Sequence, residues 1–345
     1  MSAVLCDAEL NSFLQSVQCC RLLGRMLTSW EAFSRGCQQQ TESLFRLSML
    51  TSLTHLVIAD DSNKLRDHDL AGLAKLHRLH TLVLPRFSGL YNKVDSFSGL
   101  QCLQLGYNHE SGCDLSVCTQ LTHLKLYNLH DQTDTIRLPY GDSVALQFLE
   151  LTKSAVRSCT GLAIHHLDMA LQLSRLHFDI PYPDNHIEGG WPDLLPRLQI
   201  LKLLAPSDIP VQLLNYTSLQ NLDLSGISAH LPFWFSGMTR LKKLNLEGAK
   251  CGFQECILDL AQLESLNLMN AEPPLQLSDS LLRLSDWQHL CSLEMSFAAH
   301  GTHQPGMMET VMNLMLLQEA FEARSTVSPL TVNGERGVAC LCNSN

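Results

Sequence analysis

The chain of 345 residues lacks the features that would place it in several large classes of protein. Only 17% of its residues are charged and 6% are aromatic, and the acids outnumber the bases to give a formal net charge of −10. Binding to a nucleic-acid backbone needs clustered Lys and Arg, so this acidic chain predicts no nucleic-acid partner. No apolar run approaches the roughly 18 residues that span a bilayer, which predicts no membrane insertion.

Motifs for catalysis, metal binding and export are also missing. The sequence contains no glycine-rich phosphate loop, no G-x-S-x-G elbow, no H-E-x-x-H helix and no C-x-x-C pair. The 13 cysteines do not have the spacing of zinc modules, so we predict a non-enzymatic protein with no cofactor and no metal. The first residues lack the basic start and apolar centre of a signal peptide, which favours a cytoplasmic protein with free thiols.

Internal repetition is the dominant feature of the sequence. A six-residue segment with the pattern L-x-x-L-x-L recurs eleven times, and successive copies begin 21 to 27 residues apart. Thirty of the 33 sites defined by its first, fourth and sixth positions are Leu. The copies begin at Leu53, Leu79, Leu100, Leu121, Leu146, Leu173, Leu198, Leu219, Leu241, Leu263 and Leu290.

The pattern has a direct structural meaning. Alternation at the fourth and sixth positions is the period of a strand with one buried face. A unit this short cannot bury its own apolar edge, so neighbouring units must stack with their strands side by side in a parallel sheet. Each buried Leu contributes roughly 1.5–3 kcal/mol, which supplies most of the driving force for stacking.

At these residues the sequence resembles the leucine-rich repeat family, with degenerate L-x-x-L-x-L-x-x-N units of plant or green-algal type over residues 51–300. The resemblance implies an α/β solenoid with a curved parallel sheet on its concave side and helical, 3₁₀ and extended segments on its convex side. It also implies a scaffold for a protein partner and, through algal relatives in the ciliary axoneme, a place in the cytoskeleton or axoneme. The Asn expected at the ninth position occurs only at Asn108, so we expect irregular convex turns.

The segments outside the strands are expected to be partly helical. Residues 1–50 predict a helical N-terminal cap, and residues 301–345 predict a capping helix over 306–324 followed by a mobile tail. Leu spacing also predicts helical returns over 63–77 and 277–289. The residues from Ile164 to Met169 fit the strand template too, but we place the strand of this unit after Leu173 because the next interval is then regular.

A candidate partner-binding surface follows from the same alternation. The third, fifth and seventh positions of each unit point away from the leucine core. Strands lie about 4.8 Å apart, so nine such residues of the central units should form one patch. Tyr, Phe and Arg, which dominate binding hot spots, occur among them. The patch comprises His123, Lys125, Tyr127, Phe148, Glu150, Thr152, Arg175, His177 and Asp179, whereas the later strands present the polar strip Asn221, Asp223, Asn245, Glu247, Asn267 and Glu294.

Two other functions remain open at this point. Trp30, after two expected helices, is loosely similar to the end of an F-box, which would make the chain a substrate adaptor for ubiquitin ligation. The expected Leu-Pro opening of such a box is missing. A metal or thiol enzyme is the third class, and the scattered His and Cys residues give it little support.

Overall fold

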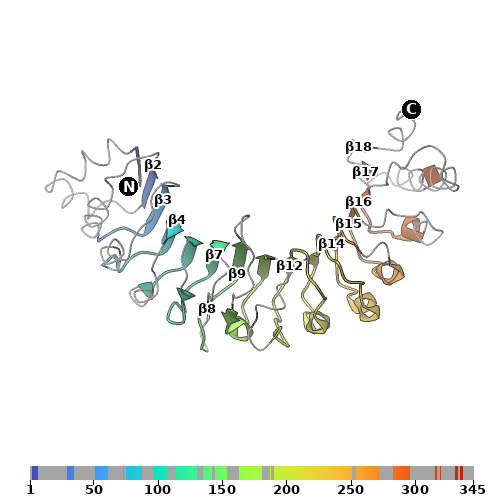
Figure 1. Cartoon of the computed structure of the whole chain (residues 1–345), viewed down its shortest axis with the longest axis horizontal. Coiled ribbons are helices and arrows are strands. Elements are labelled where there is room, and N and C mark those ends of the chain that lie inside the picture. The colour runs from blue at the N-terminus through green and yellow to red at the C-terminus, as the bar shows by residue number, and fades with distance from the viewer. Residues whose placement is uncertain are drawn as a thin grey trace. The chain divides into compact units, whose positions relative to one another are not determined.

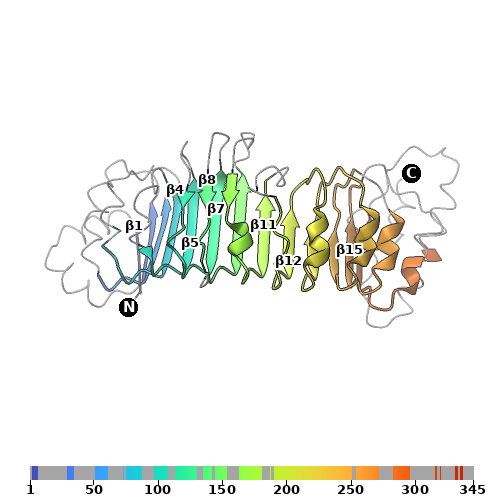
Figure 2. The ribbon, with the colours of Figure 1, turned by 90° about the horizontal axis from the view of Figure 1, so that it is seen from below.

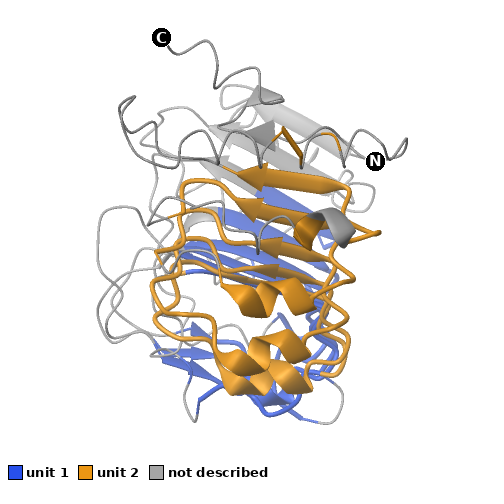
Figure 3. Ribbon diagram, turned by 90° about the vertical axis from the view of Figure 1, so that its right-hand side faces the viewer, with its two compact units in different colours: residues 1–179, 185–195 blue, residues 180–184, 196–345 orange. Residues whose placement is uncertain are grey.

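A computed structural model shows how the repeats stack. It describes residues 2–6, 29–34, 51–60, 73, 75–87, 97–107, 113–129, 135–141, 144–153, 163–180, 187, 190–250, 254–271, 283–295, 315–316, 319, 331–332 and 335–336. Among these residues, no helix combines the length and the apolar character needed to cross a bilayer. The chain divides into two compact units, one of residues 1–179 and 185–195 and another of residues 180–184 and 196–345 (Figure 3).

Unit 1 contains a parallel sheet whose strands lie side by side (Figure 2). The fourth-position leucines of successive repeats are Cα partners, for example Leu103 with Leu124 and Leu124 with Leu149, and all three side chains are buried. In spatial order the strands are β1 (Ser2–Cys6), β2 (Ser29–Ser34), β3 (His55–Asp60), β4 (Thr81–Phe87), β5 (Cys102–Tyr107), β7 (His123–Leu129), β9 (Phe148–Lys153) and β11 (Arg175–Asp179).

Unit 2 repeats the arrangement with shorter strands. Leu222, Leu244 and Leu266 are successive Cα partners and are buried. The strands are β12 (Ile200–Leu203), β13 (Asn221–Asp223), β14 (Lys243–Asn245), β15 (Ser265–Leu268), β16 (Ser292–Met295), β17 (Thr331–Val332) and β18 (Glu335–Arg336). The return segments form the 3₁₀ helices η4 (Val211–Asn215), η5 (Phe233–Gly237), η6 (Glu255–Asp259) and η7 (Arg283–Asp286), which lie on the side opposite the strands (Figure 1).

Each of the eleven predicted units contributes one strand to these sheets, from β3 to β16. The predicted parallel leucine-rich repeat solenoid is therefore confirmed. The choice of Leu173 is also correct, because Leu176 on β11 pairs with Leu149 on β9. The alternative segment forms a strand of a different sheet instead.

That second sheet lies among the return segments of unit 1. It consists of β6 (Cys113–Asp114), β8 (Thr135–Arg137) and β10 (Ala163–His165), in the order β10-β8-β6. Cys113, Ile136 and Ile164 form its buried row, and Ile187 adds an isolated parallel bridge to Ile164. The convex side here is therefore more regular than expected, because short apolar triplets in neighbouring returns pair with one another. The next segment, η2 (Leu167–Met169), is a 3₁₀ helix.

The helical caps are not supported. The described parts of residues 1–50 are strands, and Trp30 on β2 pairs with Leu56 instead of following two helices. At the other end, Thr331–Val332 pairs with β16 and Glu335–Arg336 pairs with β17, so these residues of the predicted mobile tail extend the sheet. Of the predicted 306–324 helix, the structure describes only positions 315, 316 and 319, which are helical.

The helices predicted in two return segments agree with the structure only in part. Over 277–289 the described helix is 3₁₀ and spans Arg283–Asp286. Over 63–77 most residues lie outside the described part, although Leu73 is helical and both Leu73 and Leu76 are buried. The ninth-position residues of unit 2 replace the missing Asn with apolar groups, because Pro206, Ile227 and Ala249 are buried there.

Candidate protein-binding surface

The outward side chains of three neighbouring strands in unit 1 form the candidate surface, which we call the central face. Strands β7, β9 and β11 pair in parallel, so Phe148 lies between His123 and Arg175 in one row and Glu150 lies between Lys125 and His177 in the next. The structure thus brings together the nine predicted residues His123, Lys125, Tyr127, Phe148, Glu150, Thr152, Arg175, His177 and Asp179, all of them at least partly exposed.

Aromatic rings occupy the middle of the central face. The Phe148 ring lies 5.9 Å from the ring of His123 in a tilted arrangement and 5.5 Å from the ring of His177 in an edge-to-face arrangement. These centroid distances are within the range in which aromatic rings attract one another. The three rings therefore hold each other in place across three strands, and Phe148 is at their centre.

Charged side chains surround the rings. Lys125 Nζ lies 2.7 Å from Glu150 Oε1, and Thr152 Oγ1 donates a hydrogen bond of 3.5 Å to the same oxygen. A partly exposed ion pair of this kind contributes at most about 1 kcal/mol, so it orders the two side chains more than it stabilises the fold. Arg175 is exposed and makes no ion pair with any residue that the structure describes.

Tyr127 also makes a contact within the sheet. Its hydroxyl donates a hydrogen bond of 3.3 Å to the carbonyl oxygen of Leu84 on β4. Strand β5 lies between β4 and β7, and its Gly106 is the Cα partner of Tyr127. Gly106 is buried although it occupies an outward position, as expected if the Tyr127 side chain crosses over it. Tyr127 therefore stabilises the sheet, although its side chain remains partly exposed.

The polar strip of unit 2 is also structural in part. Asp223 Oδ1 accepts a hydrogen bond of 3.0 Å from the Ser225 main-chain N–H, and Asn245 Oδ1 accepts one of 3.0 Å from Glu247. Asn267 repeats the contact with Met269 at 2.9 Å. Asp or Asn at the fifth position therefore ends β13, β14 and β15 with an Asx turn. The recurrence of Asx at this position is the sequence signal for these turns, and the interpretation of the strip as outward polar side chains overlooks it.

Asx turns in unit 2 coincide with left-handed backbone. Gly226, Gly248 and Asn270, each three residues after the Asx, have φ of +73°, +68° and +56°. Ala205 occupies the equivalent position of the repeat that has Lys202 in place of an Asx, and its φ is +45°. Gly adopts this conformation without steric cost, whereas Ala does so with strain. This column of turns replaces the missing Asn ladder in bending the chain away from each strand.

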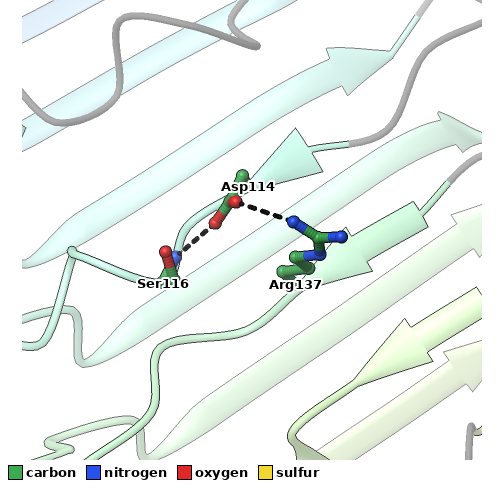
Figure 4. A network of polar contacts seen from close by, with 3 residues as sticks. All are labelled: Asp114, Ser116 and Arg137. Atoms are coloured by element: carbon green, nitrogen blue, oxygen red, sulfur yellow. Dashed lines mark hydrogen bonds and ion pairs between the residues drawn. The ribbon is translucent and has the colours of Figure 1, made fainter.

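A second polar cluster lies on the small sheet of unit 1 (Figure 4). Asp114, Arg137 and His165 are partners in one row across β6, β8 and β10. Asp114 accepts hydrogen bonds from the Ser116 main-chain N–H at 3.0 Å and from Arg137 at 3.4 Å. Partial burial acts to raise the pKa of Asp114, but the bonds from Ser116 and Arg137 outweigh it and lower this pKa below its usual range. Burial, with Arg137 and His166 nearby, lowers the pKa of His165.

Neither surface has the composition of a metal site. Among the described residues, no three His, Cys, Asp or Glu side chains are grouped closely enough to hold a metal ion. Cys113 and Cys118, one of the C-x4-C pairs, are both buried in the core of unit 1. The interpretation of these two cysteines as small core residues is confirmed.

Comparisons with known proteins give a likeness of fold only. No family model matches the chain, and no curated protein matches its sequence. Among solved structures, an internalin (inlF) from Listeria monocytogenes is 16% identical with a TM-score of 0.49, over 88% of this chain and 87% of that one. The LRR protein LIC12759 of Leptospira interrogans is 17% identical with a TM-score of 0.47, over 80% and 74%.

A third structure, the functional domain of InlJ from Listeria monocytogenes, is 19% identical with a TM-score of 0.45, over 78% of this chain and 57% of that one. All three TM-scores lie below 0.5. The solenoid assignment therefore rests on the eleven repeats of this chain and on the register of its own strands.

Proposed function

We propose that the chain is a non-enzymatic scaffold that binds a protein partner on the central face of unit 1. The observation that carries the proposal is the Phe148 ring held between His123 and His177, next to the exposed Arg175. Aromatic and Arg side chains at the centre of a contact supply most of the binding energy in protein interfaces.

The rigidity of the sheet supports the same function. Each of the three strands buries the alternating apolar residues of its inner face, for example Leu149 and Leu151 on β9, so the backbone that carries the outward side chains is held in place. A surface that is ordered before binding loses less conformational entropy when the partner arrives. The Lys125–Glu150 pair at the edge of the rings gives the polar surround that protein interfaces commonly have.

The test begins with identification of the partner by pull-down of the full chain and mass spectrometry. Calorimetry should then show that Phe148→Ala and Arg175→Ala each weaken binding by about 1–3 kcal/mol, the range expected for anchor residues. Ser292→Ala is the matched control, because Ser292 faces outward on β16 of unit 2. An affinity that survives the Phe148/Arg175 double change would contradict the proposal.

The described residues give no support to the alternative adaptor function. An F-box around Trp30 needs helices, and Trp30 lies on a strand that continues the sheet.

A cytoplasmic location and a place in the ciliary axoneme stay predictions. Fractionation of cells that make the protein tests both.

A further inference from the structure

The return segments of unit 2 carry an exposed apolar surface that the central face does not explain. It consists of the exposed Val211 and Leu214 on η4, the exposed Phe233 on η5 and the partly exposed Trp234 beside it, and we call it the aromatic ridge. Val211 and Phe233 both lie eight residues before the first Leu of the next repeat, so they occupy equivalent positions on neighbouring 3₁₀ helices.

Three apolar side chains of the aromatic ridge are unusually exposed to solvent. Phe233 is 90% exposed, Val211 55% and Leu214 39%. Phe235, two residues further along η5, is fully buried and fills the core instead. Burying a Phe side chain is worth about 1.5–3 kcal/mol, and Phe233 contributes almost none of this to folding. Contiguous apolar side chains left in water mark sites of interaction.

The backbone holds the ridge in place. Pro232 fixes the start of η5 at φ −69°, and Ser236 Oγ donates a hydrogen bond of 3.0 Å to the Phe233 carbonyl oxygen. A Cβ atom at Gly237 would lie 3.2 Å from Leu214 Cδ2, so η4 and η5 are in close contact. Phe233 therefore projects from a fixed turn and does not need a flexible loop to reach a partner.

Charge distinguishes between the possible partners. The three helices η4, η5 and η6 contain no Lys, Arg or His, and their two charged residues are Glu255 and Asp259 on η6. Both carboxylates are exposed. Glu255 occupies the position on η6 that is equivalent to Phe233 on η5. The adjoining loops add three exposed bases: His230, which lies 2.7 Å from the Gln254 amide nitrogen, Arg240, which donates a hydrogen bond of 3.0 Å to the Thr217 carbonyl oxygen, and Lys250. The acidic charge is therefore confined to η6, where the two carboxylates disfavour contact with anionic lipid or with a second copy of this acidic chain.

We propose that the aromatic ridge is a second docking surface, which inserts Phe233 into an apolar pocket of a protein partner whose Lys or Arg side chains face Glu255 and Asp259. Phe233 and Trp234 supply the apolar contact, and the two carboxylates set the orientation and the charge preference. This surface is separate from the central face, so binding at one of the two surfaces can be disproved without affecting the proposal for the other.

Site-specific photocrosslinking in the cells that make the protein tests the proposal. The full chain carries the photoreactive residue p-benzoylphenylalanine at position 233 or, as a matched control, at Tyr140, an exposed aromatic position in unit 1. The expected result is a protein adduct at 233 whose mapped peptide contains apolar and Lys or Arg residues. The Glu255→Lys/Asp259→Lys double change should lower its yield at least about tenfold, and Ser292→Ala on β16 should leave it unchanged.

Several outcomes would overturn the proposal. These are a yield at 233 no higher than at 140, an adduct with lipid or with a second copy of the chain, and a yield that charge reversal does not reduce. Flotation with vesicles of phosphatidylcholine and phosphatidylserine provides the lipid comparison in vitro, and binding that depends on Phe233 would also count against it. Thermal melts of Phe233→Ala should match those of the wild type, because the side chain is exposed.

Discussion

The hydroxyl of Tyr127 on β7 donates a hydrogen bond to the carbonyl oxygen of Leu84 on β4, and the strand between them contributes a glycine, Gly106, at the crossing point. The bond joins residues 43 positions apart in the chain. It links three repeats on the outer face of the sheet, where alternation alone would leave the side chain in solvent.

Removal of this bond should destabilise unit 1. We expect Tyr127→Phe to lower the free energy of unfolding by about 0.5–1.5 kcal/mol, the usual net value of one hydrogen bond. Tyr140→Phe is the control, because Tyr140 is 52% exposed and its hydroxyl makes no hydrogen bond to a described residue. Urea denaturation measures both changes. Equal effects of the two substitutions would show that the Leu84 contact does not form in solution.

The leucine column of unit 2 should be sensitive to truncation. Leu244 is 1% exposed and pairs in register with Leu222 and Leu266. Leu244→Ala should cost about 2–5 kcal/mol, because it removes buried methyl groups and leaves a cavity. Lys243→Ala on the same strand, whose side chain is exposed, should cost little. A cost below about half a kilocalorie for Leu244→Ala in denaturant melts would be incompatible with this register.

Gly226 should resist substitution for two separable reasons. Its φ is +73°, and an added Cβ would lie 3.3 Å from the Cβ of Ala205. We expect Gly226→Ala to destabilise by about 1–2 kcal/mol through the left-handed backbone alone, with a further cost from the contact. Repeating the change in an Ala205→Gly background removes the contact and leaves the backbone cost. If the two backgrounds give the same loss, the contact contributes nothing.

Stability at low pH should depend on Asp114. Its pKa is lowered in the folded state, so its ionised form is stabilised by Ser116 and Arg137. The contribution is fully present above the unfolded pKa of about 3.9 and is lost as the pH falls through the lower folded value. Asp114→Asn should therefore be less stable than the wild type at neutral pH, and the difference should shrink below about pH 4.

The control for this pH dependence is Asp168→Asn, because Asp168 is exposed on η2. Urea unfolding of the wild type and both variants over a pH series provides the measurement. A difference between the wild type and Asp114→Asn that stays constant down to low pH would contradict the role assigned to Arg137.

The main sheet of each unit follows from the amino-acid sequence alone. A Leu at the fourth and sixth positions of each unit can be buried only on one face of a strand, and a repeat of 21 to 27 residues can be stable only if its neighbours stack against it. These two constraints act locally and between adjacent units, so the repeat spacing is sufficient to align Leu222, Leu244 and Leu266. The outward position of the nine central-face residues follows from the same alternation.

The conformation of the segments between the strands depends on tertiary contacts. The residues from Ala163 to His165 form a strand because Thr135–Arg137 in the neighbouring return segment pairs with them, and a single short triplet has no periodicity that would predict this. Trp30 lies on a strand because β3 offers an edge with which its backbone can pair. The distinction between Arg175, which is exposed, and Tyr127, which is partly exposed and bonded to Leu84, depends on contacts between residues far apart in the chain. Such contacts arise only when the repeats are stacked, so the periodic pattern within one repeat contains no information about them.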